Sequence, residues 1–192
     1  MTEPALNLLF VCTANISRSA YAERRAAALL SGHPRVRVAS AGIPGYPGRP
    51  MDEQMAAILR EQGIGPTGHV SRSLDADALA LADLVLTFEF AQHMRILDAW
   101  PEQSAAVFGL NPFADAAGGI AADDNPTSGS TPAELIAAVS SKARPDSMTS
   151  DIADPYRRGR RAAARAASEI DAALVKLLPW LKQAEAATAQ PS

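Results

Sequence analysis

Residues 8–19 of this 192-residue chain read LLFVCTANISRS, and this stretch indicates the fold. The apolar run 8–11 is typical of a buried parallel strand, and a helical pattern begins at Ser19. Between them lies a loop of C-x5-R form, from Cys12 to Arg18. A tight loop from a strand into a helix aims several backbone N–H groups and the positive end of a helix dipole at one point. The stretch therefore predicts an anion-binding loop at the carboxyl end of a strand.

Cys12 and Arg18 supply the side-chain chemistry that such a loop needs. A dianionic phosphate would be held by backbone amides and by the planar guanidinium, which forms two hydrogen bonds at once. The same field favours the thiolate of Cys12, which is the nucleophilic form. Ser19 can donate a hydrogen bond to the sulfur and ease its departure as a leaving group. A buried cysteine that merely ends a core strand is the common alternative for a lone Cys, and the spacing to Arg18 argues against it.

The segment VCTANISRS, residues 11–19, resembles the V-C-x-G-N-x-C-R-S signature of the low-molecular-weight protein tyrosine phosphatases. That family shares its fold with thiol-linked arsenate reductases. The resemblance implies that Cys12 is the nucleophile and Arg18 the phosphate clamp. The substrate-binding residues that it implies in the loop are Thr13, Ala14, Asn15, Ile16, Ser17 and Ser19.

The loop departs from the family pattern at two positions. Ala14 stands where the family has glycine, and it would be strained if that position requires a positive φ. Ser17 replaces the second cysteine, which removes a redox partner for Cys12.

Asp154-Pro155-Tyr156 resembles the D-P-aromatic motif that carries the family's general acid. A phenolic leaving group must receive a proton as the P–O bond breaks, and a proline biases the preceding residue toward an extended conformation. Asp-Pro can also simply start a turn. After a complete anion-binding loop we assign Asp154 as the acid and Asp151 as the runner-up. Tyr156 is predicted to stack on a substrate ring, with Tyr46 as a second candidate at the mouth.

Two further residues resemble the family's loop supports. Ser40, in Ser-Ala-Gly, corresponds to a serine that braces the loop asparagine, here Asn15. His69 corresponds to a histidine in the same buried network, although an exposed loop histidine is an equally good interpretation. His93 lies in a helical pattern and is expected to be structural.

Alternating apolar patterns along the chain predict an α/β fold. Strands are expected at 8–11, 36–39, 84–87 and 107–108, and helices at 19–30, 51–63, 75–81, 91–100, 133–141 and 159–182. This order argues for a parallel four-stranded sheet with helices on both faces, and the family resemblance makes it a flavodoxin-like three-layer sandwich. Ligands of such sheets bind beyond the carboxyl ends of the strands, which is where Cys12 falls.

We expect a single phosphatase domain over residues 1–192, with two less ordered parts. The Ala-, Gly-, Asp- and Ser-rich stretch 114–131 is typical of a surface loop, and it lies in a mobile insertion at about 113–150. A disordered tail is expected from about residue 183.

Composition narrows the class of protein. The hydrophobic content of 47% supports a proper core, and the net charge of −3 gives no general attraction to nucleic acid. Apolar runs fall short of the roughly 18 residues of a membrane span, and the first six residues are unlike a signal peptide. A single cysteine excludes an internal disulfide and a multi-thiolate metal site. We therefore expect a cytoplasmic monomer or weak dimer that uses no metal or organic cofactor.

The function that the family resemblance implies is hydrolysis of phosphomonoesters through a cysteinyl-phosphate. The expected partner is a phosphotyrosine-containing protein or a small aryl phosphate, with no nucleic acid and no membrane. Two alternatives stay open. An arsenate reductase would need an external small thiol, because Cys12 has no partner cysteine. A phosphoprotein-binding module, impaired at Ala14, would not need the acid at Asp154.

Overall fold

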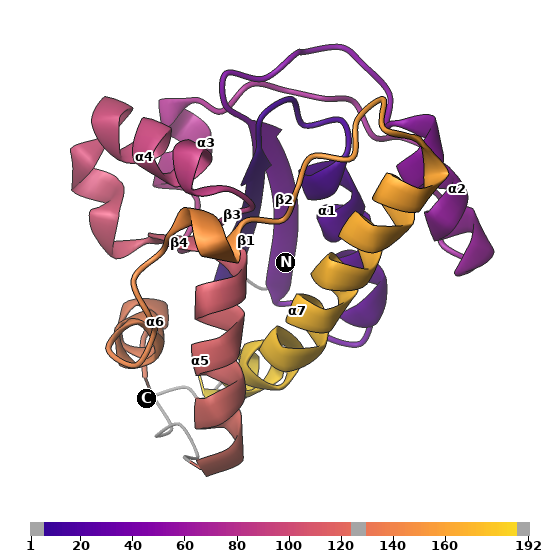
Figure 1. Cartoon of the computed structure of the whole chain (residues 1–192). Helices are drawn as coiled ribbons and strands as arrows, with labels where there is room; N and C mark the ends of the chain where they lie inside the picture. The colour runs from indigo at the N-terminus through magenta and orange to yellow at the C-terminus, as the bar shows by residue number, and fades with distance from the viewer. Residues whose placement is uncertain (1–5, 124–129, 188–192) are drawn as a thin grey trace.

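A computed structural model describes residues 6–123 and 130–187, and its centre is a four-stranded parallel sheet (Figure 1). The strand order is β2-β1-β3-β4. The strands are β1 (Leu6–Cys12), β2 (Val36–Gly42), β3 (Leu84–Thr87) and β4 (Val107–Gly109). The chain crosses from β1 to β2 on one side and later returns to the other side of β1, so the strand order switches at β1.

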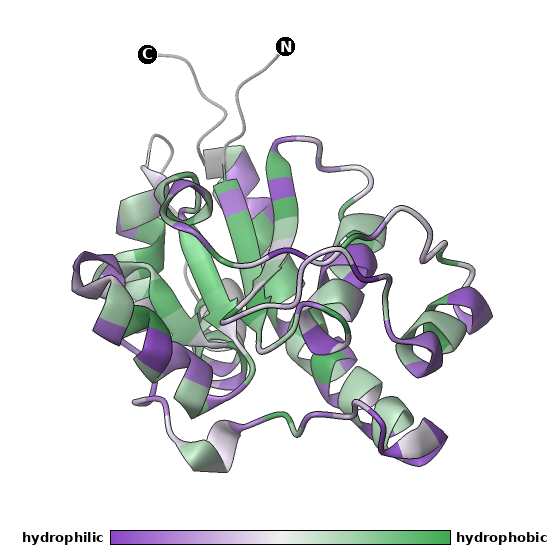
Figure 2. Cartoon of the chain, turned by 90° about the horizontal axis from the view of Figure 1, so that it is seen from above, coloured by the Kyte–Doolittle hydropathy of each residue, from purple (hydrophilic) through white to green (hydrophobic). Residues whose placement is uncertain are grey.

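The described helices pack around this sheet. They are α1 (Arg18–Leu29), α2 (Glu53–Glu61), α3 (Ala76–Ala80), α4 (Phe90–Ala99), α5 (Leu110–Asp123), α6 (Pro132–Ser140) and α7 (Gly159–Ala187), with 3₁₀ turns η1 (Pro101–Ala105) and η2 (Met148–Ser150). Seen from above, the apolar sheet lies between helices whose polar residues face outward (Figure 2).

The two faces of the sheet are buried separately, because alternate residues of a strand point to opposite sides. Leu8 and Phe10 of β1 pack with α1, α5 and α7, whereas Leu9 and Val11 pack with Leu79 of α3 and its neighbours. Helices therefore cover both faces, and the predicted three-layer α/β architecture is confirmed.

Register brings the carboxyl ends of three strands to one edge. Cys12 is paired with Gly42 of β2, and Val11 is paired with Thr87 of β3. The loop that follows Cys12 thus lies where the strand order switches, at the place predicted for a ligand.

The prediction of a surface loop at 114–131 is wrong for residues 114–123. These residues belong to α5, where Ala114 and Ala117 are fully buried and Phe113 packs edge-on against Trp180 of α7, with ring centroids 5.5 Å apart. Small residues let two helices approach closely, so a composition that looks loop-like is here a packing surface. α6 agrees with the predicted helix at 133–141, and residues 124–129 lie outside the described residues.

The prediction of a disordered tail from residue 183 is wrong for residues 183–187. α7 continues through Pro179 to Ala187, and Ala184 is buried. Residues 188–192 lie outside the described part of the chain.

Candidate active site

The loop between β1 and α1 turns its carbonyl groups outward. Each of five successive carbonyl oxygens, from Cys12 to Ile16, accepts a hydrogen bond from another segment. The donors, in that order, are Ile43 N (2.8 Å), Gly45 N (2.9 Å), Tyr46 N (3.3 Å), His69 Nε2 (2.7 Å) and Asp52 N (2.9 Å). In a trans peptide the next N–H points opposite to the carbonyl. The N–H groups of residues 13–17 therefore turn toward the inside of the loop, which is the arrangement an anion requires.

Asn15, and not Ala14, is the loop residue in the left-handed conformation. Its φ is 58°, and among the described non-glycine residues only Arg157 shares a positive φ. Asparagine tolerates this region better than most side chains. The hypothesis that Ala14 is strained in place of a glycine is therefore wrong: alanine carries no penalty at a negative φ.

A buried network fixes Asn15 and links it to the nucleophile. Asn15 Nδ2 donates to Ser19 Oγ (3.0 Å) and to Ser40 Oγ (2.7 Å), and its Oδ1 accepts from the N–H of Arg72 (2.9 Å). Ser19 Oγ lies 3.0 Å from Cys12 Sγ. Because Ser19 already accepts from Asn15, its own hydrogen is available to the sulfur or to the nearby carbonyl of Ala41.

His69 and Ser40 lie where the sequence places loop supports. His69 is buried, and its Nε2 must carry the proton because the Asn15 carbonyl can only accept. Ser40 donates to Glu23 while accepting from Asn15. The interpretation of His69 as an exposed loop residue is wrong.

Gly42, which sequence reasoning left without a role, allows the loop to approach the sheet. A Cβ atom at this position would lie 2.8 Å from Gly45 Cα and 2.9 Å from the loop backbone at Ala14 and Asn15. These distances are shorter than any normal carbon contact. Only glycine therefore fits between β2 and the loop.

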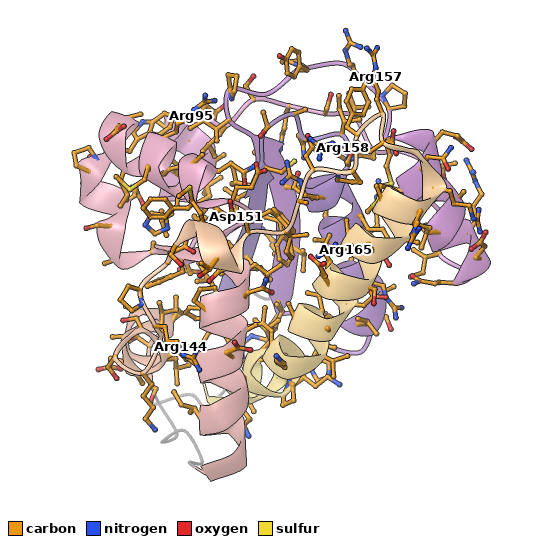
Figure 3. All side chains as sticks on the ribbon, in the orientation of Figure 1. Arg95, Arg144, Asp151, Arg157, Arg158 and Arg165 are labelled. Atoms are coloured by element: carbon orange, nitrogen blue, oxygen red, sulfur yellow. The ribbon has the colours of Figure 1, made fainter. Side chains whose placement is uncertain are left out.

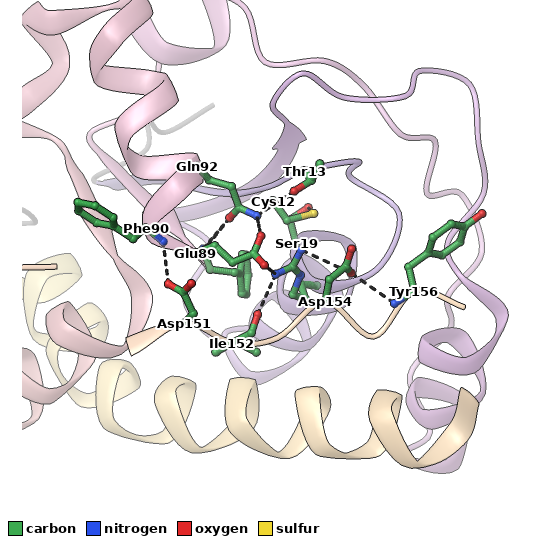
Figure 4. Close-up of polar contacts among 12 residues, drawn as sticks. Cys12, Thr13, Ser19, Glu89, Phe90, Gln92, Asp151, Ile152, Asp154 and Tyr156 are labelled. Atoms are coloured by element: carbon green, nitrogen blue, oxygen red, sulfur yellow. Dashed lines mark hydrogen bonds and ion pairs between the residues drawn. The ribbon is translucent and has the colours of Figure 1, made fainter. Parts of the chain in front are cut away.

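Arg18 is held from three sides, and its side chain is 1% exposed. Its Nη1 donates to Ile152 O (2.8 Å) and lies 3.1 Å from Glu89 Oε1, and its Nη2 lies 3.4 Å from Asp154 Oδ1 (Figure 4). Within the described part of the chain, Nε of Arg18 is buried without a hydrogen-bond partner, as is Oγ of Ser17. Two potential donors on the loop thus lack an acceptor among the described residues, although both side chains line the cavity.

Glu89 and Gln92 contact Arg18 and Thr13 of the site, and sequence reasoning missed both of them. They form a capping box at the start of α4, in which Gln92 accepts from the Glu89 N–H (3.1 Å) and donates to its carboxylate (2.6 Å). Gln92 Nε2 also donates to Thr13 Oγ1 (3.1 Å). The E-x-x-Q spacing was the available signal, but it indicates only a helix start. The contact with the loop depends on how α4 packs.

Asp154 and Asp151 lie in different surroundings. Asp154 is half-exposed and lines the cavity, and its Oδ1 accepts from Tyr156 N (3.3 Å). Asp151 accepts from Phe90 N (2.7 Å) and is not among the residues that line the cavity (Figure 4). Burial raises the pKa of Asp151, and the charges of Glu89 and Asp146 raise it further, against the hydrogen bond from Phe90 and the charge of Arg18.

A cavity of about 330 Å³ opens over the loop and brings the predicted residues together. Its lining comprises Cys12, Thr13, Ala14, Ile16, Ser17, Arg18, Tyr46, Arg49, Asp154, Tyr156 and Arg157. Arg49 and Arg157 were not predicted, and both add positive charge at the mouth. His93 lies elsewhere: it stacks on Phe90 and its Nδ1 is 3.3 Å from Asp146.

The family model for low molecular weight phosphotyrosine protein phosphatases matches residues 7–144. The chain belongs to this family. Among curated relatives, the low molecular weight protein-tyrosine-phosphatase Ptp of Acinetobacter johnsonii is 35% identical over 104 residues, which are 54% of this chain and 71% of that protein. The corresponding phosphatase Wzb of Escherichia coli is 33% identical over 101 residues, 53% of this chain and 67% of the relative. The family resemblance seen in the sequence is thus confirmed.

Solved structures agree with the family fold. The tyrosine phosphatase AmsI of Erwinia amylovora superimposes with a TM-score of 0.67 at 23% identity and covers 91% of both chains. The arginine phosphatase YwlE of Geobacillus stearothermophilus gives 0.68 at 23% identity over 90% of both chains. Low molecular weight protein-tyrosine phosphatases are hydrolases, so this chain belongs to a family of hydrolases. Within the described residues, none of the helices has the length and apolar content to span a bilayer.

Proposed function

We propose that this chain hydrolyses phosphotyrosine in proteins, with Cys12 as nucleophile, Arg18 as phosphate clamp and Asp154 as general acid. The observation that carries the proposal is the loop itself: five outward carbonyls leave its amides facing inward, next to the buried Nε of Arg18. The matched family segment ends at residue 144. The role of Asp154 therefore rests on its place in the cavity and its 3.4 Å contact with Arg18.

The reaction proceeds in two displacement steps. The Cys12 thiolate attacks phosphorus, an S–P bond forms, and the P–O bond to tyrosine breaks as the Asp154 carboxyl gives its proton to the leaving oxygen. Water then attacks phosphorus and gives a proton to Asp154, and the S–P bond breaks to regenerate the thiolate. The Ser19 hydroxyl, 3.0 Å from the sulfur, stabilises the departing thiolate. Arg18 and the loop amides bind the equatorial oxygens, on which charge gathers in the transition state.

Aromatic walls favour an aryl phosphate. Tyr156 and Tyr46 both line the cavity, and Tyr46 is 53% exposed and available to a substrate ring. Ile16 adds an apolar surface on the loop. A flat phenyl group between such side chains gains both burial and ring stacking.

The test compares four substrates with the intact chain and with Cys12→Ser. We expect p-nitrophenyl phosphate and a phosphotyrosine peptide to be hydrolysed, and a phosphoserine peptide and a phosphoarginine peptide to be much poorer substrates. The phosphoarginine arm is needed because a solved structure of similar fold is an arginine phosphatase. Hydrolysis that survives in Cys12→Ser would refute the mechanism, and preference for phosphoarginine would refute the substrate class.

The two alternatives give other outcomes in the same experiment. Consumption of an added small thiol that depends on arsenate, without phosphatase activity, would indicate an arsenate reductase. Tight binding of phosphotyrosine peptide without turnover would indicate a binding module.

We further propose that the chain acts in the cytoplasm as a monomer or weak dimer. A nucleophilic thiol without a second cysteine stays active where cellular thiols keep it reduced. Sedimentation at several concentrations measures the oligomeric state.

A further inference from the structure

A second cavity, of about 480 Å³, adjoins the phosphate cavity on the far side of Asp154. Asp154 lines both of them. One wall of the second cavity is the segment 153–155, and the other is the exposed face at the beginning of α7. We call this second cavity the arginine groove. Its lining comprises Ala153, Asp154, Pro155, Arg158, Arg161, Ala162, Arg165, Ala166 and Glu169.

The arginine groove carries an excess of positive charge. Five of the chain's 18 basic residues lie between positions 157 and 165, a stretch with no acidic residue, although the whole chain has a net charge of −3. Arg160 forms an ion pair with Glu61 (2.6 Å), and Arg165 forms one with Glu169 (2.8 Å). The acidic residues that line the groove are Glu169 and Asp154, and Asp154 is already paired with Arg18.

Arg158 and Arg161 are the cations in the groove that are open to a ligand. Both side chains are exposed, and among the described residues neither has a carboxylate within ion-pair distance. Figure 3 shows Arg157, Arg158 and Arg165 on the same side of the molecule, along the segment that leads from the mouth into α7. Arg157, in the wall of the phosphate cavity, makes the positive surface continuous from the mouth to the groove.

The spacing of the arginines matches an extended peptide. Arg158 and Arg161, the two open cations, are three residues apart around the beginning of α7, and both line the groove. Side chains at alternate positions of an extended chain point to the same side and are separated by about 6.6 Å. Two carboxylates in an acidic-x-acidic arrangement can therefore lie opposite two guanidinium groups, with Arg158 nearer to the phosphate cavity.

We propose that the arginine groove binds an acidic segment next to the phosphotyrosine of the substrate protein. The inference rests on the proposed function and narrows its substrate class to phosphotyrosines flanked by alternating acidic residues. A peptide is favoured over a separate polyanion because the groove and the catalytic cavity lie on either side of Asp154. A single peptide that places its phosphotyrosine in the phosphate cavity can therefore reach the groove with its flanking residues.

The experiment compares kcat/KM for three phosphotyrosine peptides of equal length. One has glutamates at two alternate positions within about five residues on the amino side of the phosphotyrosine, one has them on the carboxyl side, and one has glutamine at all four positions. The variant is Arg158→Gln with Arg161→Gln. Its control is Arg95→Gln with Arg144→Gln, which removes the same charge from exposed positions away from the groove (Figure 3).

We expect one acidic peptide to be preferred over the glutamine peptide by about two- to tenfold in kcat/KM, because two exposed ion pairs stabilise binding by about this much. The preference should fall as salt is raised and should vanish in the groove variant but persist in the control. Turnover of p-nitrophenyl phosphate, which does not reach the groove, should change less than twofold in either variant.

Four results would overturn the proposal. The first three are an equal kcat/KM for all three peptides, a preference that survives in the groove variant, and an equal loss of preference in the control variant. The fourth is inhibition by a single-stranded DNA oligonucleotide that is stronger than inhibition by the unphosphorylated acidic peptide and that depends on Arg158 and Arg161. Equal hydrolysis of all peptides removes the groove alone. Failure to hydrolyse any peptide or p-nitrophenyl phosphate removes the proposed function together with the groove.

Discussion

Glu89→Gln tests how the phosphate clamp is held. Glu89 Oε1 lies 3.1 Å from Arg18 Nη1, and the same carboxylate belongs to the capping box at the start of α4. Glutamine keeps the size of the side chain and an acceptor oxygen for the cap, but it removes the negative charge. The substitution therefore isolates the ion pair from the helix cap.

The size of the effect follows from the surroundings of the pair. Two unit charges 3.1 Å apart attract by about 5 kcal/mol at an effective dielectric constant of about 20. Desolvation of the 1% exposed Arg18 offsets most of this, and Ile152 O and Asp154 continue to hold the guanidinium in the variant. We expect a net loss of about 1–2 kcal/mol, the value of a hydrogen bond to a charged group. This corresponds to a kcat about 5- to 30-fold lower.

Binding of inorganic phosphate should respond differently from turnover. Glu89 repels a phosphate dianion, so its neutralisation removes a cost of binding while the clamp becomes less well oriented. We therefore expect the inhibition constant of phosphate to stay unchanged or to fall while kcat falls.

The assay is steady-state hydrolysis of p-nitrophenyl phosphate with phosphate as inhibitor, accompanied by thermal unfolding. Glu53→Gln is the matched control, because it breaks an exposed Glu–Arg pair on α2 (2.8 Å) whose side chains do not line the phosphate cavity. A kcat within twofold of the original chain would show that Arg18 is oriented without Glu89. A larger inhibition constant for phosphate would refute the argument that Glu89 orients Arg18 for turnover while its charge opposes phosphate binding.

Three further predictions concern the acid, the loop approach and a buried tyrosine. Asp154→Asn should slow phenyl phosphate much more than p-nitrophenyl phosphate, by about 10²–10⁴-fold for the poorer leaving group; equal losses for the two esters would reassign the acid. Gly42→Ala should cost about 1–3 kcal/mol of stability and most of the activity, because its Cβ would lie 2.9 Å from the loop backbone, whereas Gly32→Ala, with nothing within 4 Å, should change neither. Burial, aided by the charge of Asp171, raises the pKa of Tyr21 to about 12. Between about pH 10 and 12 the unfolded chain therefore loses this proton while the folded chain keeps it, and stability should fall by up to about 1.4 kcal/mol per pH unit. Tyr21→Phe should remove that slope in urea unfolding at about pH 9 and pH 11, and an unchanged slope would contradict the assignment.

The parts of the site that the sequence predicted are those with a local signal. The loop from Cys12 to Arg18 is contiguous, and its strand and helix are marked by their own apolar periods. Ser40 and Asp154 could be proposed because each lies in a short motif of the family. The ion pair between Arg18 and Glu89 joins residues 71 positions apart. No local pattern encodes such a pair, since it depends on the packing of β3 and α4 beside β1.

The same limit explains the error over α5. Residues 114–123 are rich in alanine and glycine, which local propensity treats as weak and mobile. In the structure Ala114 and Ala117 are buried between α5 and α7, and Gly118 lies where a Cβ would be 3.4 Å from Lys176. Small side chains are thus needed for close helix packing, and that need becomes visible only when both helices are in place.

Ala14 shows how a family signature can suggest strain at the wrong residue. A glycine in a signature suggests a backbone that only glycine tolerates, but the left-handed residue of this loop is the neighbouring Asn15. Asn15 holds that conformation because its side chain and its carbonyl are both engaged: the side chain with Ser19, Ser40 and the Arg72 N–H, and the carbonyl with His69. The backbone strain therefore lies at Asn15, where hydrogen bonds compensate for it, and Ala14 is not strained. The glycine that the loop does require is Gly42, 28 positions after Ala14 in the sequence and on β2, where the loop backbone leaves no room for a Cβ.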